Sequence, residues 1–486
     1  MNPLIGRTFA IYIFAFAFFL ASRPISDADF WFHLKTGEYI IQTGLIPRTD
    51  TFSFTNYGTP WIAHGWLSGV IFYAVYSRLG FKALIFIFAI LTALAFWIVF
   101  KRSNSHPFIA GFATLLGVWT VLPTIGVRPR VFTLLLASVY LAILTRYARR
   151  GEGREIWWLV PLMVLWVNLH GGFLIGLALI GLTMVGIPLD TWAAGEKVRA
   201  SWPRLRTLGL VLVGCLLAGL ANPYGTGIYA ETIRTLISPV YQQLVVDWLS
   251  PNFHQPELRP LTFLILLTIG AIALSPKRVR PGELLLFLAA LYSTLQTQRN
   301  MALLALVAVP IFANYFQDWL DSTSFGRSFG KSFSKPQPSR YSTWITALSL
   351  VLLLPLLVFA LRLRSTVYSS PTQRMLDVPL KAVQYLKERQ ISGNTFTNPN
   401  IWGGYLIWAL PSNPVYIDGR GVFPEEFVKE YVEIMQGTAD WRVPFERYGV
   451  KIVLIKPGSL LARQLAESSE WERVYDDEMS VVFRRR

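Results

Sequence analysis

Long apolar runs alternate with short polar connections over the first three quarters of this chain. Several of these runs extend for about 17–20 residues without a charge, the length that a helix needs to cross roughly 30 Å of hydrocarbon. The pattern predicts a mainly α-helical, polytopic membrane protein. We expect about eleven spanning helices, at 8–22, 83–100, 107–123, 131–147, 156–169, 171–188, 207–221, 260–275, 283–296, 301–316 and 343–362.

The distribution of Lys and Arg gives these spans a direction, because cytoplasmic connections carry an excess of basic residues. We place the N-terminus in the cytoplasm and the short apolar segment 66–79 along the membrane surface. The inner connections then hold Lys and Arg at roughly three times the density of the outer ones. A cleavable signal peptide would also show Arg7 before an apolar run, but this topology needs 8–22 as an uncleaved first span.

Composition favours a membrane protein over a nucleic-acid-binding one. Of 486 residues, 53% are hydrophobic and 15% charged, whereas about a quarter are charged in a soluble domain. The net charge of +16 follows from the basic inner connections, so we expect the bilayer of the cell membrane, and no nucleic acid, as partner. The single cysteine, Cys215, lies in an apolar run, which excludes an intrachain disulfide and indicates a buried thiol.

The composition changes after the last predicted span. We expect a transmembrane domain at 1–364, with a first outer loop at 23–82, and a soluble, extracytoplasmic α/β domain at 365–486. Periodicity within the soluble domain predicts helices and buried strands. The expected helices are 378–390, 424–436 and 459–467; the expected strands are 415–417, 452–455 and a hairpin of 472–475 with 480–483.

A cluster of ionisable residues directly follows the first predicted span, in the sequence Asp27-Ala-Asp29-Phe-Trp-Phe-His33. Ionisable groups at a membrane boundary are costly and usually face a cavity or a partner. The two carboxylates could supply a general base, or bind a divalent cation such as Mg²⁺ or Mn²⁺. Alternatively, Ser26 or Asp27 caps the helix that begins here, and Asp29, beyond the cap position, complements the helix dipole.

Three arginines lie in predicted outer connections, against the general trend of basic residues. Arg128 and Arg130 flank a proline between two spans, and Arg299 lies between two others. Arginine binds phosphate through paired donors, so these residues are candidates for binding an anionic partner. Contact with the phosphates of lipid headgroups is the simpler alternative.

Two further histidines belong to the predicted outer face. His64 lies just before the surface segment 66–79, where it could bind a phosphate, transfer a proton or anchor the surface. His170 precedes two glycines between spans; a turn explains the glycines but not the imidazole. We take His33, His64 and His170 as possible substrate-binding residues. P-loop, G-x-S-x-G, H-E-x-x-H and Cys/His metal patterns are absent from the sequence, which disfavours ATP-driven transport and serine or zinc hydrolysis.

Together these motifs resemble the GT-C superfamily of membrane glycosyltransferases. The most similar members are bacterial proteins related to the protein O-mannosyltransferases and the lipid A aminoarabinose transferases. The resemblance covers most of the chain and points to a bacterial branch more clearly than to a reaction. The resemblance rests on the sequence motifs at residues 27–34, 46–53, 61–67, 168–172, 402–405 and 416–420.

The resemblance implies transfer of a sugar from a polyprenyl phosphate or pyrophosphate donor to a lipid, glycan or protein outside the cytoplasm. It makes Asp29 the candidate catalytic base and Asp27 its neighbour. It also implies that the donor phosphate, as the leaving group, is bound by basic side chains. The candidates are Arg128, Arg130 and Arg299.

Two other functions fit the same residues. A transporter or flippase of a lipid-linked substrate needs binding without chemistry, although the paired repeats typical of transporters are not evident and the polar motifs gather on one predicted face. A catalytically inactive scaffold with the same fold is the second alternative. Gly65 supports the inactive scaffold, because members of this branch are expected to carry an acidic residue at this position. The missing acidic residue also weakens an acid–base or metal-binding role for the segment around His64.

Overall fold

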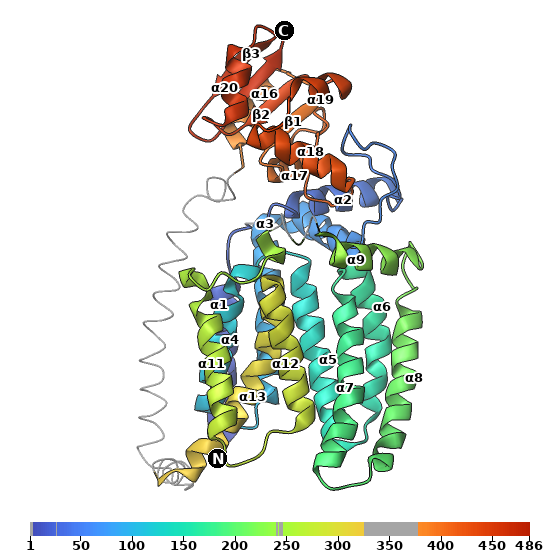
Figure 1. Cartoon of the computed structure of the whole chain (residues 1–486), viewed down its shortest axis with the longest axis vertical. Coiled ribbons are helices and arrows are strands. Elements are labelled where there is room, and N and C mark those ends of the chain that lie inside the picture. Colours follow the sequence, from blue (N-terminus) through green and yellow to red (C-terminus); the bar gives the residue numbers. More distant parts are fainter. Residues whose placement is uncertain (1–2, 26, 240–241, 243–245, 325–377) are drawn as a thin grey trace. The chain divides into compact units, whose positions relative to one another are not determined.

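The computed structural model describes residues 3–25, 27–239, 242, 246–324 and 378–486. The chain divides into two compact units, each built from segments that are distant in sequence (Figure 1). We call them the helical unit (Met1–Arg23, Ile85–Thr226 and Leu236–Ser369) and the mixed unit (Pro24–Leu84, Gly227–Thr235 and Ser370–Arg486). The predicted boundary between residues 364 and 365 lies outside the described residues.

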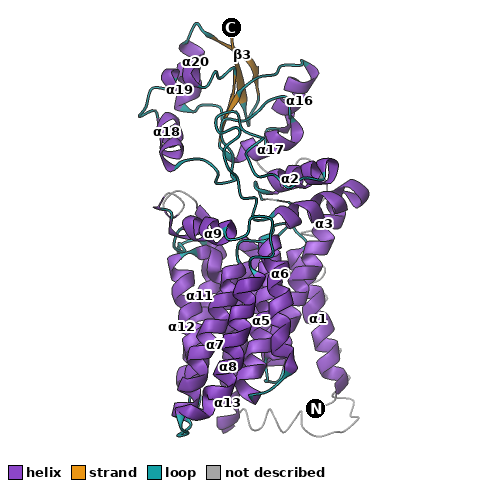
Figure 2. Cartoon of the chain, turned by 90° about the vertical axis from the view of Figure 1, so that its right-hand side faces the viewer, coloured by secondary structure: helices purple, strands orange, loops and turns teal. Residues whose placement is uncertain are grey.

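The helices of the helical unit occupy the predicted apolar segments and run along one common direction (Figure 2). They are α1 (Pro3–Ala21), the second part of α3 (Trp66–Arg102), α4 (Pro107–Val121), α5 (Arg130–Arg150), α6 (Leu159–Leu169), α7 (Phe173–Ala193), α8 (Trp202–Ala218), α11 (Arg259–Leu274), α12 (Pro281–Gln296) and α13 (Met301–Ser322). Short 3-10 helices join them: η1 (Leu122–Thr124), η2 (Arg154–Trp158), η3 (Val198–Ser201), η4 (Val246–Trp248), η5 (Pro256–Leu258) and η6 (Gln298–Asn300).

The multi-pass membrane class is confirmed by these helices. Within the described residues, 7 helices are long and apolar enough to cross a bilayer, and Phe9–Ala21 is a shorter apolar helix. Every predicted span that the structure describes contains a helix. The predicted span 343–362 lies outside the described residues, so the total number of spans stays a prediction.

Helix α13 is the packing centre of the helical unit. It contacts α4, α5, α11 and α12, and its residues are buried without a break from Leu304 to Ala313. Small residues let neighbouring membrane helices approach closely. At Gly117 of α4, for example, a Cβ atom would come within 2.5 Å of Val309 Cγ2, so a larger residue would push α4 away from α13.

Helix α3 is broken at Gly80, whose φ of 74° lies in the left-handed region. Glycine adopts this conformation without the steric cost that a Cβ adds. The break separates 66–79 from the following apolar run, as the sequence predicted. Whether 66–79 lies along the membrane surface stays a prediction.

In the mixed unit, α2 (Phe30–Thr43) packs closely on the first part of α3. A Cβ on Gly37 would overlap the carbonyl of Gly69, so glycine is required at this crossing. Helix α2 also contacts α17 (Ile401–Ala409). The first outer loop and the C-terminal region therefore fold together as one unit.

The C-terminal part of the mixed unit has a four-stranded sheet with the order β1-β2-β4-β3. Strands β1 and β2 are parallel, and the other two pairs are antiparallel. The strands are β1 (Thr395–Asn398), β2 (Ile452–Ile455), β3 (Trp471–Asp476) and β4 (Val481–Arg485). The remaining helices are α9 (Gly227–Ile237), α16 (Leu380–Glu388), α18 (Glu425–Gln436), α19 (Arg442–Arg447) and α20 (Leu460–Glu467). An aromatic core that includes Phe396, Tyr416 and Trp471 packs against the sheet.

Most of the elements predicted after residue 378 are confirmed. The three expected helices correspond to α16, α18 and α20, and the strand 452–455 and the hairpin correspond to β2, β3 and β4. The strand predicted at 415–417 is wrong. Only Val415 pairs, through isolated bridges to Ser53 and Thr395, because this buried segment turns at residues 418–420 before it can extend a ladder.

Candidate active site

Asp27 and Asp29 lie in the turn that leads into α2. Oδ1 of Asp27 accepts a hydrogen bond from the Asp29 N–H at 3.2 Å, so Asp27 stabilises the turn. Asp29 occupies the N-cap position of α2, but its side chain makes no capping hydrogen bond. The expectation that Asp29 lies beyond the cap position is wrong. Capping nevertheless does not account for its half-buried carboxylate.

The mixed unit brings His33 and His64 near each other. The His33 ring packs on Phe32, with centroids 4.3 Å apart, and approaches Phe72 at 6.1 Å. Burial, and to a lesser extent the charge of His64, lowers the pKa of His33 to about 3. His33 is therefore neutral at physiological pH. It can form hydrogen bonds but offers no positive charge to a phosphate.

We expect acidification to destabilise the mixed unit through His33. The unfolded chain binds a proton there near pH 6.5, whereas the folded chain does so only near pH 3. The contribution to stability is complete above pH 6.5 and is lost as the pH falls toward 3. Thermal unfolding of the purified protein should therefore shift to lower temperature between pH 7.5 and pH 5, with up to about 2 kcal/mol arising from His33.

Two variants isolate this contribution. His33→Gln should reduce the difference between the two pH values, because glutamine does not titrate. His254→Gln, at an exposed histidine, should leave the difference unchanged. Equal pH dependence of the wild type and His33→Gln would contradict the assignment of a neutral, buried imidazole.

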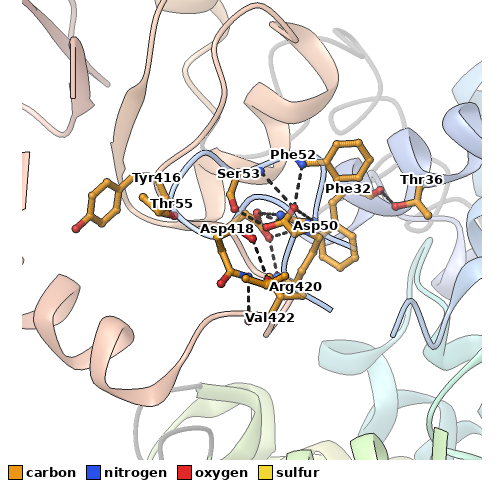
Figure 3. Close-up of polar contacts among 12 residues, drawn as sticks. Phe32, Thr36, Asp50, Phe52, Ser53, Thr55, Tyr416, Asp418, Arg420 and Val422 are labelled. Carbon is orange, nitrogen blue, oxygen red and sulfur yellow. Dashed lines mark hydrogen bonds and ion pairs between the residues drawn. The ribbon is translucent and has the colours of Figure 1, made fainter. Parts of the chain in front are cut away.

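A buried ion triad joins the first outer loop to the C-terminal region within the mixed unit (Figure 3). Arg420 Nε lies 2.9 and 3.0 Å from the two Asp418 oxygens, and Nη2 lies 2.7 Å from Asp418 Oδ2. Arg420 Nη1 donates to Asp50 Oδ1 at 2.8 Å. All three side chains are 0% exposed. Burial alone would lower the pKa of Arg420, but Asp418 and Asp50 raise it, so the guanidinium stays protonated.

The surroundings of the triad complete its hydrogen bonding. Asp50 Oδ1 accepts from the N–H groups of Phe52 and Ser53 at 2.9 and 3.3 Å, and its Oδ2 accepts from the Ser53 hydroxyl. The guanidinium lies 5.1 Å from the Phe52 ring centroid and 4.8 Å from that of Trp61, a favourable cation–π geometry. These buried charges are paired on all sides, which is the condition for retaining them in an interior.

The helical unit gathers the three predicted arginines around one carboxylate. Asp247 Oδ2 lies 2.8 Å from Arg130 Nη2 and 3.7 Å from Arg128 Nη1. Arg299 stacks on the ring of Trp248 at 4.0 Å. We call these residues, Arg128, Arg130, Asp247, Trp248 and Arg299, the basic cluster. Asp247 and Trp248 were not predicted as site residues, because nothing in their local sequence distinguishes them from an ordinary loop.

The basic cluster carries excess positive charge. Burial would raise the pKa of Asp247, but the three arginines lower it below its usual range. A fourth arginine, Arg23, lies close enough to Arg128 for the two positive charges to interact. Nη1 of Arg130 is buried and, within the described residues, has no hydrogen-bond partner. In the described part of the chain, Asp247 therefore faces several guanidinium groups, which is a suitable arrangement for binding an additional anion.

His170 lies at the junction of α6 and α7 in the helical unit. Its Nδ1 accepts from the Gly172 N–H at 3.0 Å and lies 2.9 Å from the Thr133 hydroxyl. Thr133 also accepts from Trp166 Nε1 at 2.8 Å. This network gives the imidazole a role in shaping the turn. The substrate-binding role of His170 stays a prediction.

The acidic turn of Asp27 and Asp29 was predicted as a possible site for a divalent cation. Within the described ranges, no group of three or more His, Cys, Asp or Glu side chains is arranged to hold a metal ion. Mg²⁺ is usually bound through only one or two carboxylates, with waters and substrate phosphates as its other ligands. Cation binding by Asp27 and Asp29 therefore stays a prediction.

Two solved membrane proteins share this architecture. The oligosaccharyltransferase AglB from Archaeoglobus fulgidus, solved with an inhibitory peptide and a dolichol-phosphate, aligns with a TM-score of 0.56 and 12% identity over 92% of this chain and 69% of its own. ArnT from Cupriavidus metallidurans in the apo state aligns with a TM-score of 0.53 and 15% identity over 99% of this chain and 98% of its own. The chain has the GT-C fold.

The GT-C fold confirms the predicted resemblance at the level of architecture. No protein-family model and no curated protein sequence matches the chain. At identities of 12% and 15%, the shared fold identifies the scaffold, while function has to be argued from the residues placed on it. On this GT-C scaffold, those residues are the acidic turn and the basic cluster.

Proposed function

We propose that this chain is a membrane glycosyltransferase. It transfers a sugar from a polyprenyl-phosphate-linked donor to a lipid, glycan or protein acceptor outside the cytoplasm. AglB, which shares the fold, was solved with a dolichol-phosphate and an inhibitory peptide. The first is a lipid phosphate, like the proposed donor, and the second is a peptide, like a protein acceptor. Both ligands support the class of partner proposed here.

The observation that carries the proposal is the excess of arginine in the basic cluster. Arg128 and Arg130 share Asp247 as a counter-ion, and among the residues that the structure describes Nη1 of Arg130 has no acceptor. A phosphate oxygen would provide the missing acceptor and balance the positive charge. Because the donor phosphate gains charge as the bond to the sugar breaks, arginines that bind it also lower the barrier.

In the proposed reaction, Asp29 acts on the acceptor. Its carboxylate takes the proton of an acceptor hydroxyl or amide as the acceptor atom attacks the anomeric carbon of the sugar. The bond between that carbon and the phosphate oxygen breaks, and the phosphate leaves with the bonding electrons. A direct displacement of this kind inverts the anomeric configuration. Asp27 holds the turn that carries Asp29.

The proposal includes a topology. The N-terminus lies in the cytoplasm and the C-terminal region outside it, in the inner or plasma membrane. The distribution of basic residues supports this orientation. Lipid-linked sugars used outside the cytoplasm would then reach the basic cluster from the outer leaflet.

Donor binding tests the proposal directly. The full-length protein in nanodiscs should bind undecaprenyl phosphate, and Arg128→Ala should weaken binding by about tenfold to a hundredfold, because a charge-assisted hydrogen bond contributes about 1.5–3 kcal/mol. Arg146→Ala is the matched control. Arg146 pairs with Glu155 at the surface. It lies roughly 24 Å along α5 from Arg130, and its loss should leave the affinity unchanged.

The other outcomes point to different functions. A folded protein that binds no polyprenyl phosphate would overturn the proposal. Equal weakening by Arg128→Ala and Arg146→Ala would show non-specific electrostatic attraction to the lipid. The protein could also bind polyprenyl phosphate specifically but transfer no sugar, and the binding could persist when Asp29 is replaced. That result would instead identify a transporter or an inactive scaffold.

A further inference from the structure

We propose that the turn Asp418-Gly419-Arg420 is a positioning element that holds the Asp29 carboxylate in place for proton abstraction. This inference rests on the proposed function for the role of Asp29. It assigns a role to residues that lie almost four hundred positions away in sequence. These residues belong to the same mixed unit as Asp29.

The two ends of this turn are fixed by buried contacts. The Arg420 N–H donates to Asp418 Oδ1 at 2.8 Å, which closes the turn on itself. The Arg420 side chain then anchors the turn to Asp50 at 2.8 Å (Figure 3). Since all three charged side chains are fully buried, the turn cannot shift without exposing or unpairing a charge.

Gly419, between the two anchors, contacts the carboxylate of Asp29. A Cβ built on Gly419 would overlap Asp29 Oδ1, and the third nearest atom, Phe32 Cε1, lies 4.0 Å away. The backbone of Gly419 is not in the left-handed region, so conformation does not demand glycine. A side chain here would instead displace the Asp29 carboxylate, because Asp29 occupies the space that a Cβ atom would fill.

The opposite side of Asp29 is fixed by its own turn and by α2. Asp27 holds the Asp29 N–H, and the His33 N–H donates to the Asp29 carbonyl at 3.2 Å. Main-chain atoms of Asp29 are thus fixed from the α2 side, while its carboxylate rests on Gly419. A base held on both sides needs little reorganisation before reaction, and small misplacements of such groups can cost about 100-fold in rate.

The test is Gly419→Ala in the full-length protein in nanodiscs. The new methyl group displaces only the end of a flexible side chain, so the melting temperature should stay within about 2 °C. Asp29 can be labelled with a water-soluble carbodiimide and glycine ethyl ester, and peptide mass spectrometry measures the rate of labelling. This rate should change at least threefold in Gly419→Ala. Asp27 in the same peptide region is the internal control. Gly209→Ala is the matched glycine control, since a Cβ there meets nothing within 4 Å.

Transfer activity provides the second readout. With undecaprenyl-phosphate-linked sugars as donors, kcat for release of undecaprenyl phosphate should fall about 10- to 100-fold in Gly419→Ala, with undecaprenyl phosphate affinity unchanged. Unchanged carbodiimide reactivity of Asp29, or unchanged kcat despite altered reactivity, would overturn the inference. A wild type that is inactive on every donor would reject the proposed function, while carbodiimide reactivity would still decide whether Gly419 positions Asp29.

Discussion

Replacing Asp29 by asparagine is expected to slow sugar transfer by about 10²- to 10⁴-fold, the usual contribution of a general base. Asparagine has nearly the shape of aspartate but cannot accept the proton of the acceptor. The affinity for undecaprenyl phosphate should not change, since the proposed donor site is the basic cluster. Steady-state kcat and donor Kd, measured on the same nanodisc preparation, separate the two effects.

Asp27→Asn is the matched control for this prediction. The asparagine carbonyl can still accept the hydrogen bond from the Asp29 N–H that Asp27 accepts at 3.2 Å, so the turn is preserved. A small effect of Asp27→Asn with a large effect of Asp29→Asn would single out Asp29 as the base. Full activity of Asp29→Asn in a folded enzyme would defeat this assignment.

Replacing Arg420 by methionine is expected to destabilise the mixed unit by about 3–5 kcal/mol, because two carboxylates would lose their buried counter-ion. Differential scanning calorimetry, or limited proteolysis of the C-terminal region against temperature, would measure the loss. Arg420→Lys should recover only part of it, since an ammonium group cannot reproduce the paired donors of the guanidinium.

Two comparisons test the origin of this effect. Arg447→Met removes an exposed arginine that pairs with Glu430 at 3.2 Å, and it should leave the unfolding temperature unchanged. Neutralising both carboxylates together with Arg420, as Asp50→Asn, Asp418→Asn and Arg420→Met, should restore part of the stability. If Arg420→Met unfolds at the wild-type temperature, the triad is not a stabilising feature.

The sequence predicts the helical architecture well because one physical requirement dominates it. A helix in hydrocarbon needs a long uncharged run, and this signal is local. It predicted a helix in each of the expected spans that the structure describes, and the break near Gly80. The amphipathic helices of the C-terminal region, such as 424–436, were predicted for a similar reason, since their periodicity is visible within a short window.

The candidate site depends instead on contacts between distant segments. Asp247 looks like an ordinary loop residue in the sequence, and Asp50 belongs to the motif 46–53 but gives no sign of its partner. Only the folded chain pairs them with arginines. The strand predicted at 415–417 has the right β-branched and aromatic composition, but tertiary contacts at 418–420 end it. Four-residue β1 carries too short a pattern to be recognised before a proline.

The ion triad also affects when a newly made chain becomes functional. Asp50 and Arg420 are 370 positions apart, and a ribosome adds about 5–20 residues per second. The first outer loop therefore leaves the ribosome on the order of 20–70 s before its partner residue exists. Until then Asp29 lacks the glycine turn on which its carboxylate rests. Completion of translation thus acts as a checkpoint, and a prematurely terminated chain inserts its early helices without acquiring a competent base.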